Sequence, residues 1–266
     1  MNPQPAAGPQ AARPGSAAGV LLPLIMGALT ALAWTYLLAM AWGMMHEEAG
    51  AARMLMPGMM QWGPADLALV FAMWAVMMVA MMLPTAWPMV RTFAVLSTRG
   101  SDARGRTTAF VGAYLLVWAG FSLGITFLQW ALQAADWVTP MMALRSPAVA
   151  GALLIAAGIY QFTPLKQACL ATCRTPLAFL MTEWRPGLSG AWRMGLRHGV
   201  LCAGCCWLLM ALLFVLGVMN LAWIAVLAAF VLLEKTWPKL RWLSAAGGTA
   251  LIIWGTVLLA GIGIAA

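Results

Sequence analysis

The sequence predicts an all-α protein, a polytopic transmembrane helix bundle, and three observations lead to that fold class. Of the 266 residues, 64% are hydrophobic and only 8% are charged, whereas roughly a quarter of a soluble domain is charged. Several apolar runs reach the roughly 20 residues that a helix needs to cross about 30 Å of hydrocarbon. The alternating strands of a membrane barrel do not accompany them. Because backbone groups in lipid must be paired within their own segment, each run is predicted to be a helix.

The elements follow in order from the N-terminus. Residues 1–19 are mostly Pro, Gly, Ala and Gln with a single charge, Arg13, a composition typical of a disordered tail. Residues 20–266 are predicted to form a single transmembrane helical domain. About seven spans are expected from length and hydropathy, at 20–43, 65–90, 108–133, 147–162, 198–218, 221–234 and 243–264.

The Lys and Arg residues predict the orientation of this domain. Thirteen of the fifteen fall in the tail and in alternate gaps, and the other gaps hold only Arg53 and Arg145. Because such residues gather on the cytoplasmic side, the N-terminus is predicted to be cytoplasmic and the C-terminus external, in a bacterial cytoplasmic (inner) membrane. The formal charge of +8 therefore reflects topology in a lipid bilayer. Nucleic acid is not an expected partner, because its readers carry a basic stripe that faces solvent.

All five cysteines and one of the two histidines fall in one stretch of the chain. These candidate metal ligands are Cys169, Cys173, His198, Cys202, Cys205 and Cys206. At about 100° per residue, His198, Cys202 and Cys205 share one helix face. A helix that begins after Pro164 would point Cys169 and Cys173 in one direction. On the predicted topology both groups lie at the cytoplasmic end of the bundle.

The chemistry of these residues favours a soft metal ion. The cytoplasm is reducing, which disfavours structural disulfides and leaves the thiols available as ligands. Thiolate with imidazole suits Cu(I) first and Zn(II) second. The alternative is that the cysteines only pack as small hydrophobic residues between helices.

Methionine gives a second signal. The other histidine, His46, lies among methionines in the first external gap, at positions 40, 44, 45, 54, 56, 59 and 60. Met73, Met77 and Met81 then follow one face of the second span, with Met78 and Met82 beside them. Thioether and imidazole groups favour Cu(I), so His46 and these three methionines form a candidate inward path for the metal. Methionine used only as an adaptable apolar filler is the alternative.

Two further features fall outside these patterns. Pro84 and Pro88 release the carbonyls of Ala80 and Pro84 from the helical ladder, and freed carbonyls in a membrane must be buried in protein or line a cavity. A kink used only for helix packing is the alternative. Glu234 and Lys235 close the sixth span and are expected to pair with each other. Charge at this depth marks a candidate functional site, and a pair that only snorkels to the interface is the alternative. Phosphate-binding, zinc-protease and serine-hydrolase motifs are missing, so a non-enzymatic role is favoured and enzymatic activity stays open.

Several stretches together resemble a known family. They are AGIYQFTPLK at 157–166, CLATCR at 169–174, RMGLRHG at 193–199, CAGCCW at 202–207, GVMNL at 217–221, the pair Glu234–Lys235, and AMW and MMLP in the second span. In this order they resemble a bacterial family of unknown function described as predicted metal-binding integral membrane proteins. The resemblance covers the second to the sixth span and implies that the five cysteines and His198 are ligands.

The leading hypothesis is a protein that binds Cu(I) and moves it inward or passes it to a metallochaperone or a metalloenzyme assembly partner. A second is a membrane thiol oxidoreductase, with Cys202 and Cys205 as a Cys-x-x-Cys pair at a helix start, where the helix dipole favours a reactive thiolate. A third is a structural or assembly subunit whose cysteines only pack.

Overall fold

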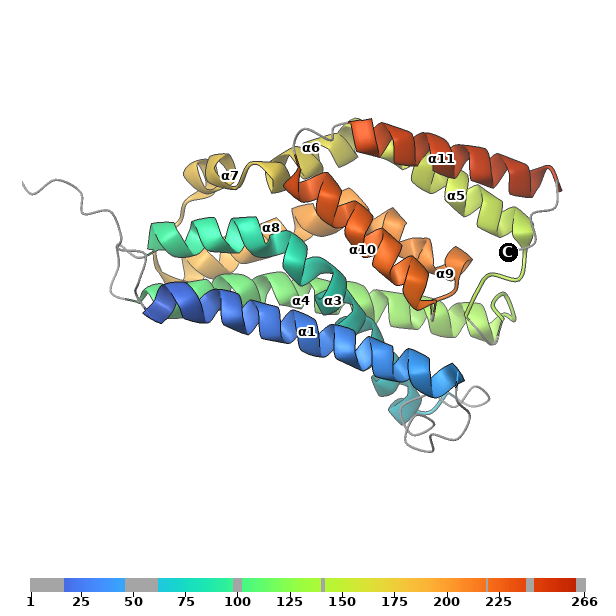
Figure 1. The fold of residues 1–266 in the computed structure, drawn as a ribbon, viewed down its shortest axis with the longest axis horizontal. Helices are drawn as coiled ribbons and strands as arrows, with labels where there is room; N and C mark the ends of the chain where they lie inside the picture. The colour runs from blue at the N-terminus through green and yellow to red at the C-terminus, as the bar shows by residue number, and fades with distance from the viewer. Residues whose placement is uncertain are drawn as a thin grey trace, which may run out of the picture.

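The long apolar runs form helices that lie roughly parallel to the long axis of the molecule (Figure 1). The computed structural model describes residues 17–45, 62–97, 102–139, 142–218, 220–237 and 242–261. The helices are α1 (Ala17–Met45), α3 (Pro64–Ser97), α4 (Ala103–Ala134), α5 (Pro147–Gln161), α6 (Pro164–Arg174), α7 (Pro176–Glu183), α8 (Gly187–Ala211), α9 (Leu213–Leu216), α10 (Leu221–Thr236) and α11 (Trp242–Leu259). The all-α fold class is therefore confirmed for the described residues.

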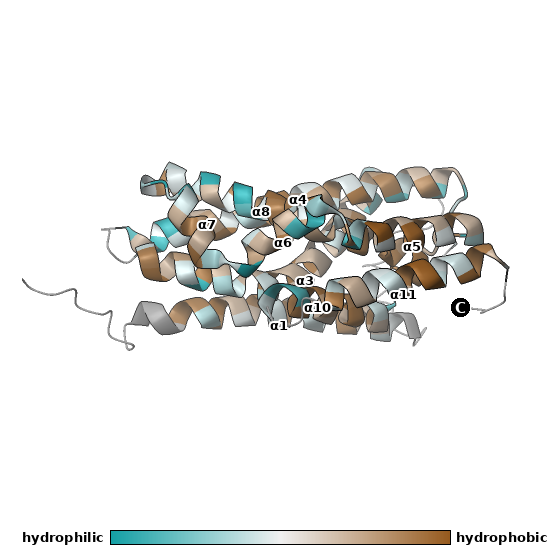
Figure 2. Ribbon diagram, turned by 90° about the horizontal axis from the view of Figure 1, so that it is seen from above, coloured by the Kyte–Doolittle hydropathy of each residue, from teal (hydrophilic) through white to brown (hydrophobic). Residues whose placement is uncertain are grey.

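Five of these helices are long and apolar enough to cross a membrane, and a sixth span results if α5 and α6, bent by 61°, count as one. This is fewer than the expected number of about seven. The reason is that α5 and α10, with 15 and 16 residues, are each too short to cross the membrane as a single helix. Large apolar side chains such as Leu24 (62% exposed), Leu32 (67%) and Val200 (60%) face outward, and apolar residues extend along most of the bundle (Figure 2). These features indicate a membrane protein. The span count, the orientation of the termini and the single-domain division stay predictions, and the tail at residues 1–16 lies outside the described residues.

α3 is the central helix of the bundle and packs against α1, α4, α7 and α10. Its methionines and Trp74 are buried. On the other side, α5 and α11 lie side by side (Figure 1). Their backbones approach closely, since a methyl group added at Gly151 would lie 2.8 Å from the carbonyl oxygen of Gly255. Glycine at such contacts lets membrane helices pack without large side chains between them.

The carbonyl that Pro84 frees is paired within the protein. The indole nitrogen of Trp34 on α1 donates a hydrogen bond of 3.2 Å to the oxygen of Ala80. This contact satisfies a group that would otherwise be unpaired in an apolar interior. It also joins the first two spans halfway along α3.

Candidate metal centre

The site residues of α8 lie well inside the helix. α8 begins at Gly187, eleven residues before His198, or roughly 16 Å at 1.5 Å per residue. The predicted span at 198–218 therefore began too late, because Arg193 and Arg197 gave the first turns of α8 a loop-like composition. Cys202 is not at a helix start, so the dipole argument for a reactive Cys-x-x-Cys pair does not apply.

Glycines bring α8 against α4 beside the site. A methyl group at Gly195 would overlap the carbonyl oxygen of Phe110 on α4. This close approach stacks the His198 ring on Phe110 and Tyr114, with ring centroids 5.9 Å and 5.4 Å apart. His198 is buried, and neither ring nitrogen has a hydrogen-bond partner within the described residues. The ring packs on aromatic neighbours, while its two nitrogens are engaged by no described residue and are available as metal ligands.

Three thiols of α8 form the middle of the site. The sulfur atoms of Cys205 and Cys206 each donate to the carbonyl oxygen of Cys202 at 3.0 Å. The sulfur of Cys202 lies 3.2 Å from the hydroxyl of Tyr114, which also donates to the Met82 carbonyl of α3 at 3.0 Å. All three thiols are buried, so the site is closed to bulk water.

The helix α6 adds a fourth thiol to this group. Thr163 caps α6 and Pro164 starts it, and both cysteines of α6 are buried, as expected for neighbours on one helix face. Cys173 lies close enough to Cys202 and Cys205 for its thiol to interact with both of theirs. Cys169 lies one helical turn before Cys173 in α6, and its sulfur would be 3.1 Å from a Cβ atom added at Gly204 of α8. The two cysteine segments therefore meet.

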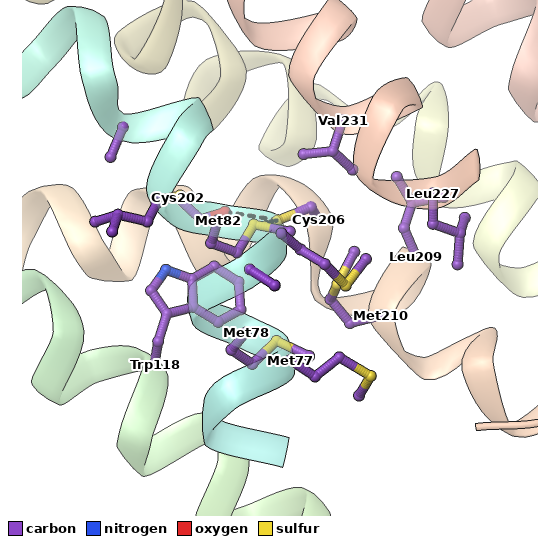
Figure 3. Packing of buried hydrophobic residues seen from close by; sticks show 14 of the residues in the cluster. Met77, Met78, Met82, Trp118, Cys202, Cys206, Leu209, Met210, Leu227 and Val231 are labelled. Carbon is purple, nitrogen blue, oxygen red and sulfur yellow. Dashed lines mark hydrogen bonds between the residues drawn. The ribbon is translucent and has the colours of Figure 1, made fainter. Parts of the chain in front are cut away.

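A lysine that the sequence pattern did not place here completes the cluster. Lys235, in the last turn of α10, points its ammonium at the Cys202 sulfur (3.0 Å), the Cys206 sulfur (3.6 Å) and the Met82 sulfur (3.9 Å). Figure 3 shows Met82 and Cys206 facing each other, with their sulfur atoms 4.0 Å apart. We call Met82, Cys173, Cys202, Cys205, Cys206 and Lys235 the sulfur cluster.

The expected pairing of Glu234 with Lys235 is wrong. The Glu234 carboxylate instead accepts two hydrogen bonds of 2.9 Å from Lys166 of α6 and one of 2.6 Å from Ser244 of α11. The ammonium of Lys166 also contacts Gln161. This buried ion pair ties α5, α6, α10 and α11 together one residue away from Lys235. It therefore fixes the end of α10 that carries the ammonium.

The methionines of α3 lead toward the sulfur cluster. Met73, Met77 and Met81 are buried, and the first two line a small cavity with Met40 of α1, between α1, α3 and α10. The methionine that reaches the thiols is Met82 and not one of the three on the predicted face. His46 and the methionines at 54–60 lie outside the described residues.

As they stand, no three His, Cys, Asp or Glu side chains of the described residues are arranged to hold a metal ion. The thiols are engaged with each other, with the Cys202 carbonyl and with Lys235. The donor set nevertheless suits a soft cation, because it offers thiols, a thioether and an unpartnered imidazole in a closed interior.

A comparison with protein families now bears on this chemistry. The family model PpoB2, described as copper chaperone, matches residues 71–258. The chain belongs to the PpoB2 copper chaperone family. The match includes every residue of the sulfur cluster. Comparison with curated proteins and with solved structures gives no match.

Three residues of this PpoB2 family member were missed as parts of the site. The sequence pattern predicts an ion pair for Lys235, places Met82 beside the methionine face of α3, and indicates no role for Tyr114. Met82 and Lys235 are 153 positions apart in the chain, so no local spacing could bring them together. The one sequence signal for Lys235 is its charge at the end of a span, because charged side chains in membrane helices usually face the protein interior.

Proposed function

We propose that this PpoB2 family member is a Cu(I) chaperone of the bacterial inner membrane. It takes up the ion along the methionines of α3, holds it at the cysteines and passes it to a metallochaperone or a metalloenzyme under assembly. The candidate ligands are Cys169, Cys173, His198, Cys202, Cys205 and Cys206. Copper is cargo in this scheme, so the site must release it as well as bind it.

The observation that carries the proposal is the meeting of thiols from two separate segments. α6 packs against α8 with the Cys169 sulfur beside Gly204. Cys173 interacts with Cys202 and Cys205 in a buried interior. Packing alone requires no such convergence, since cysteines that only fill space can face any apolar neighbour. Thiolates and thioethers select Cu(I) over harder ions, and the family description agrees with copper. Zn(II) is the second choice, because it also binds thiolate and imidazole.

An anaerobic titration with a coloured Cu(I) chelator as competitor tests the site. Wild-type protein in detergent is compared with the double variant Cys202→Ser/Cys205→Ser. We expect the variant to lose at least about a hundredfold in affinity, which corresponds to roughly 2.7 kcal/mol. Ala203→Ser is the matched control, because it adds a hydroxyl to the same turn of α8 and removes no thiol. Equal affinity for wild type and the double variant would remove the site.

The methionine path calls for a kinetic experiment. Met73→Leu/Met77→Leu removes two thioethers that line the cavity and keeps their bulk, so we expect slower loading of Cu(I) at unchanged final affinity. Met181→Leu on α7, where the side chain is 72% exposed, is the control. Stopped-flow measurement of loading in proteoliposomes gives the rates. The path is refuted if the double variant loads as fast as the control.

The same samples test the redox alternative. All five cysteines are free, and the oxidoreductase alternative requires a reversible disulfide between two of them. Differential alkylation before and after mild oxidation detects such a bond. A reversible disulfide in protein that retains no copper would favour the oxidoreductase over the chaperone.

A further inference from the structure

The ammonium of Lys235 lies where a cation bound by the sulfur cluster would lie. Its nitrogen has sulfur atoms of Cys202, Cys206 and Met82 at 3.0, 3.6 and 3.9 Å. An ammonium has three N–H donors, and thiol and thioether sulfurs are weak acceptors. The side chain is only 4% exposed. Three sulfurs from α3 and α8 therefore already surround one positive charge.

Lys235 has no carboxylate to explain its burial. Among the described residues, the hydrogen-bond partners of its ammonium are these three sulfurs. The nearest carboxylate in the chain, Glu234, is occupied by Lys166 and Ser244. A buried charge is costly unless it is paired. The sulfurs of the cluster must therefore supply the compensation, as they would for a metal ion.

We propose that the Lys235 ammonium holds the cargo position of the empty chaperone and is displaced by Cu(I), with Met82 as a thioether ligand beside Cys202 and Cys206. This inference rests on the proposed function and adds the exchange of one cation for another. It also adds Met82 and Lys235 to the residues that determine affinity.

Displacement follows from the distances. Thiolate sulfur binds a metal ion such as zinc at about 2.3 Å, so a metal between Cys202 and Cys206 would come close to the present position of the ammonium. The metal ion and the ammonium would occupy the same space and use the same sulfur atoms, so the ammonium must move aside for the metal to bind. Lys235 lies in the last turn of α10, where carbonyl groups without helical partners can accept its N–H groups once it moves.

The exchange changes no oxidation state. Each thiol that binds Cu(I) releases its proton to solvent, a copper–sulfur bond replaces the sulfur–hydrogen bond, and the ammonium moves aside. On release each thiolate takes up a proton from solvent again and the ammonium returns to the three sulfurs, so the empty state is restored. The consequence is a site of reduced affinity and faster release, as a chaperone requires.

The charge of Lys235 is tested by Lys235→Leu against Lys235→Arg. We expect Lys235→Leu to bind Cu(I) about tenfold or more tightly, or 1.4 kcal/mol, and to transfer it to a chelator correspondingly slowly. Lys235→Arg keeps the competing cation and should not tighten binding. Lys235→Gln supplies the same neutral comparison if Lys235→Leu does not fold, as judged by size-exclusion chromatography. Affinity that stays equal or falls in the neutral variant overturns the exchange.

The role of Met82 is tested by Met82→Leu, with Met89→Leu as a control that is equally buried in the same helix. X-ray absorption at the copper edge should lose one sulfur neighbour in Met82→Leu alone, and affinity should fall. An unchanged copper environment removes Met82 from the ligand set.

The proposed function and the Lys235 exchange can fail separately. Wild-type protein that binds no Cu(I) refutes both of them. Wild type that binds as tightly as Lys235→Leu refutes only the exchange.

Discussion

Removal of the Glu234 charge should destabilise the fold strongly. Lys166 and Glu234 form an ion pair with side chains 0% and 1% exposed, and Glu234→Gln would leave the Lys166 ammonium without a counter-charge. Breaking a buried pair by loss of one partner costs about 3–5 kcal/mol. Ser244, which donates to the same carboxylate at 2.6 Å, loses a hydrogen bond to a charged group as well. We therefore expect Glu234→Gln to lower the free energy of unfolding by at least about 3 kcal/mol.

The measurement is reversible unfolding in mixed micelles with increasing SDS. The control is Asp136→Asn, which breaks the ion pair with Arg145 whose side chains are 50% and 79% exposed. Exposed pairs contribute about 0–1 kcal/mol, so this variant should unfold like wild type. The double variant Lys166→Met/Glu234→Leu should recover most of the loss, because an apolar pair can replace a buried ionic one. If Glu234→Gln lowers the free energy of unfolding no more than Asp136→Asn does, the buried ion pair does not stabilise the fold as argued.

Two further variants test helix contacts. Trp34→Phe removes the donor to the Ala80 carbonyl. It should lower the free energy of unfolding by about 1–3 kcal/mol, the cost of an unpaired buried polar group. An unfolding midpoint equal to that of wild type would show that the carbonyl has another partner. Gly195→Ala places a methyl group against the Phe110 carbonyl oxygen. The overpacking should lower the free energy of unfolding by at least about 1–3 kcal/mol. Gly120→Ala, where the added methyl meets nothing within 4 Å, is its control, and equal stability of the two would contradict the close approach of α4 and α8.

The helices could be predicted because hydropathy and helix signals agree locally. The span expected at 147–162 is α5 at Pro147–Gln161, where Ser146 and Pro147 mark the start as capping rules require. α8 was placed too late because its first turns carry arginines that face outward. Arg197, for example, lies 3.0 Å from the Glu183 carboxylate. A composition that resembles a loop can therefore belong to the exposed face of a helix.

The thiols of the site could be predicted and their partners could not. Helical spacing places Cys202 and Cys205 on one face wherever the helix begins. The partners of Glu234 and Lys235 depend on which helices pack against α10, and the two neighbouring side chains point to different clusters. Lys166 lies 68 positions before Glu234. Such long-range pairs follow from packing between helices, which one sequence does not contain.

The hydroxyl of Tyr114 offers a test that separates the site from the fold. It donates to the Met82 carbonyl at 3.0 Å and lies 3.2 Å from the Cys202 sulfur, so it can accept from that thiol and fix its direction. Tyr114→Phe removes a hydroxyl whose hydrogen bonds contribute about 0.5–1.5 kcal/mol each to stability, and we expect Cu(I) affinity to fall severalfold because the thiol loses its orientation. Tyr160→Phe is the matched control, since that hydroxyl donates to the Gly204 carbonyl at 2.5 Å and should affect stability alone. Unfolding and chelator competition are measured on both variants; if both lose the same Cu(I) affinity, the effect of Tyr114 is exerted through the fold and not through Cys202.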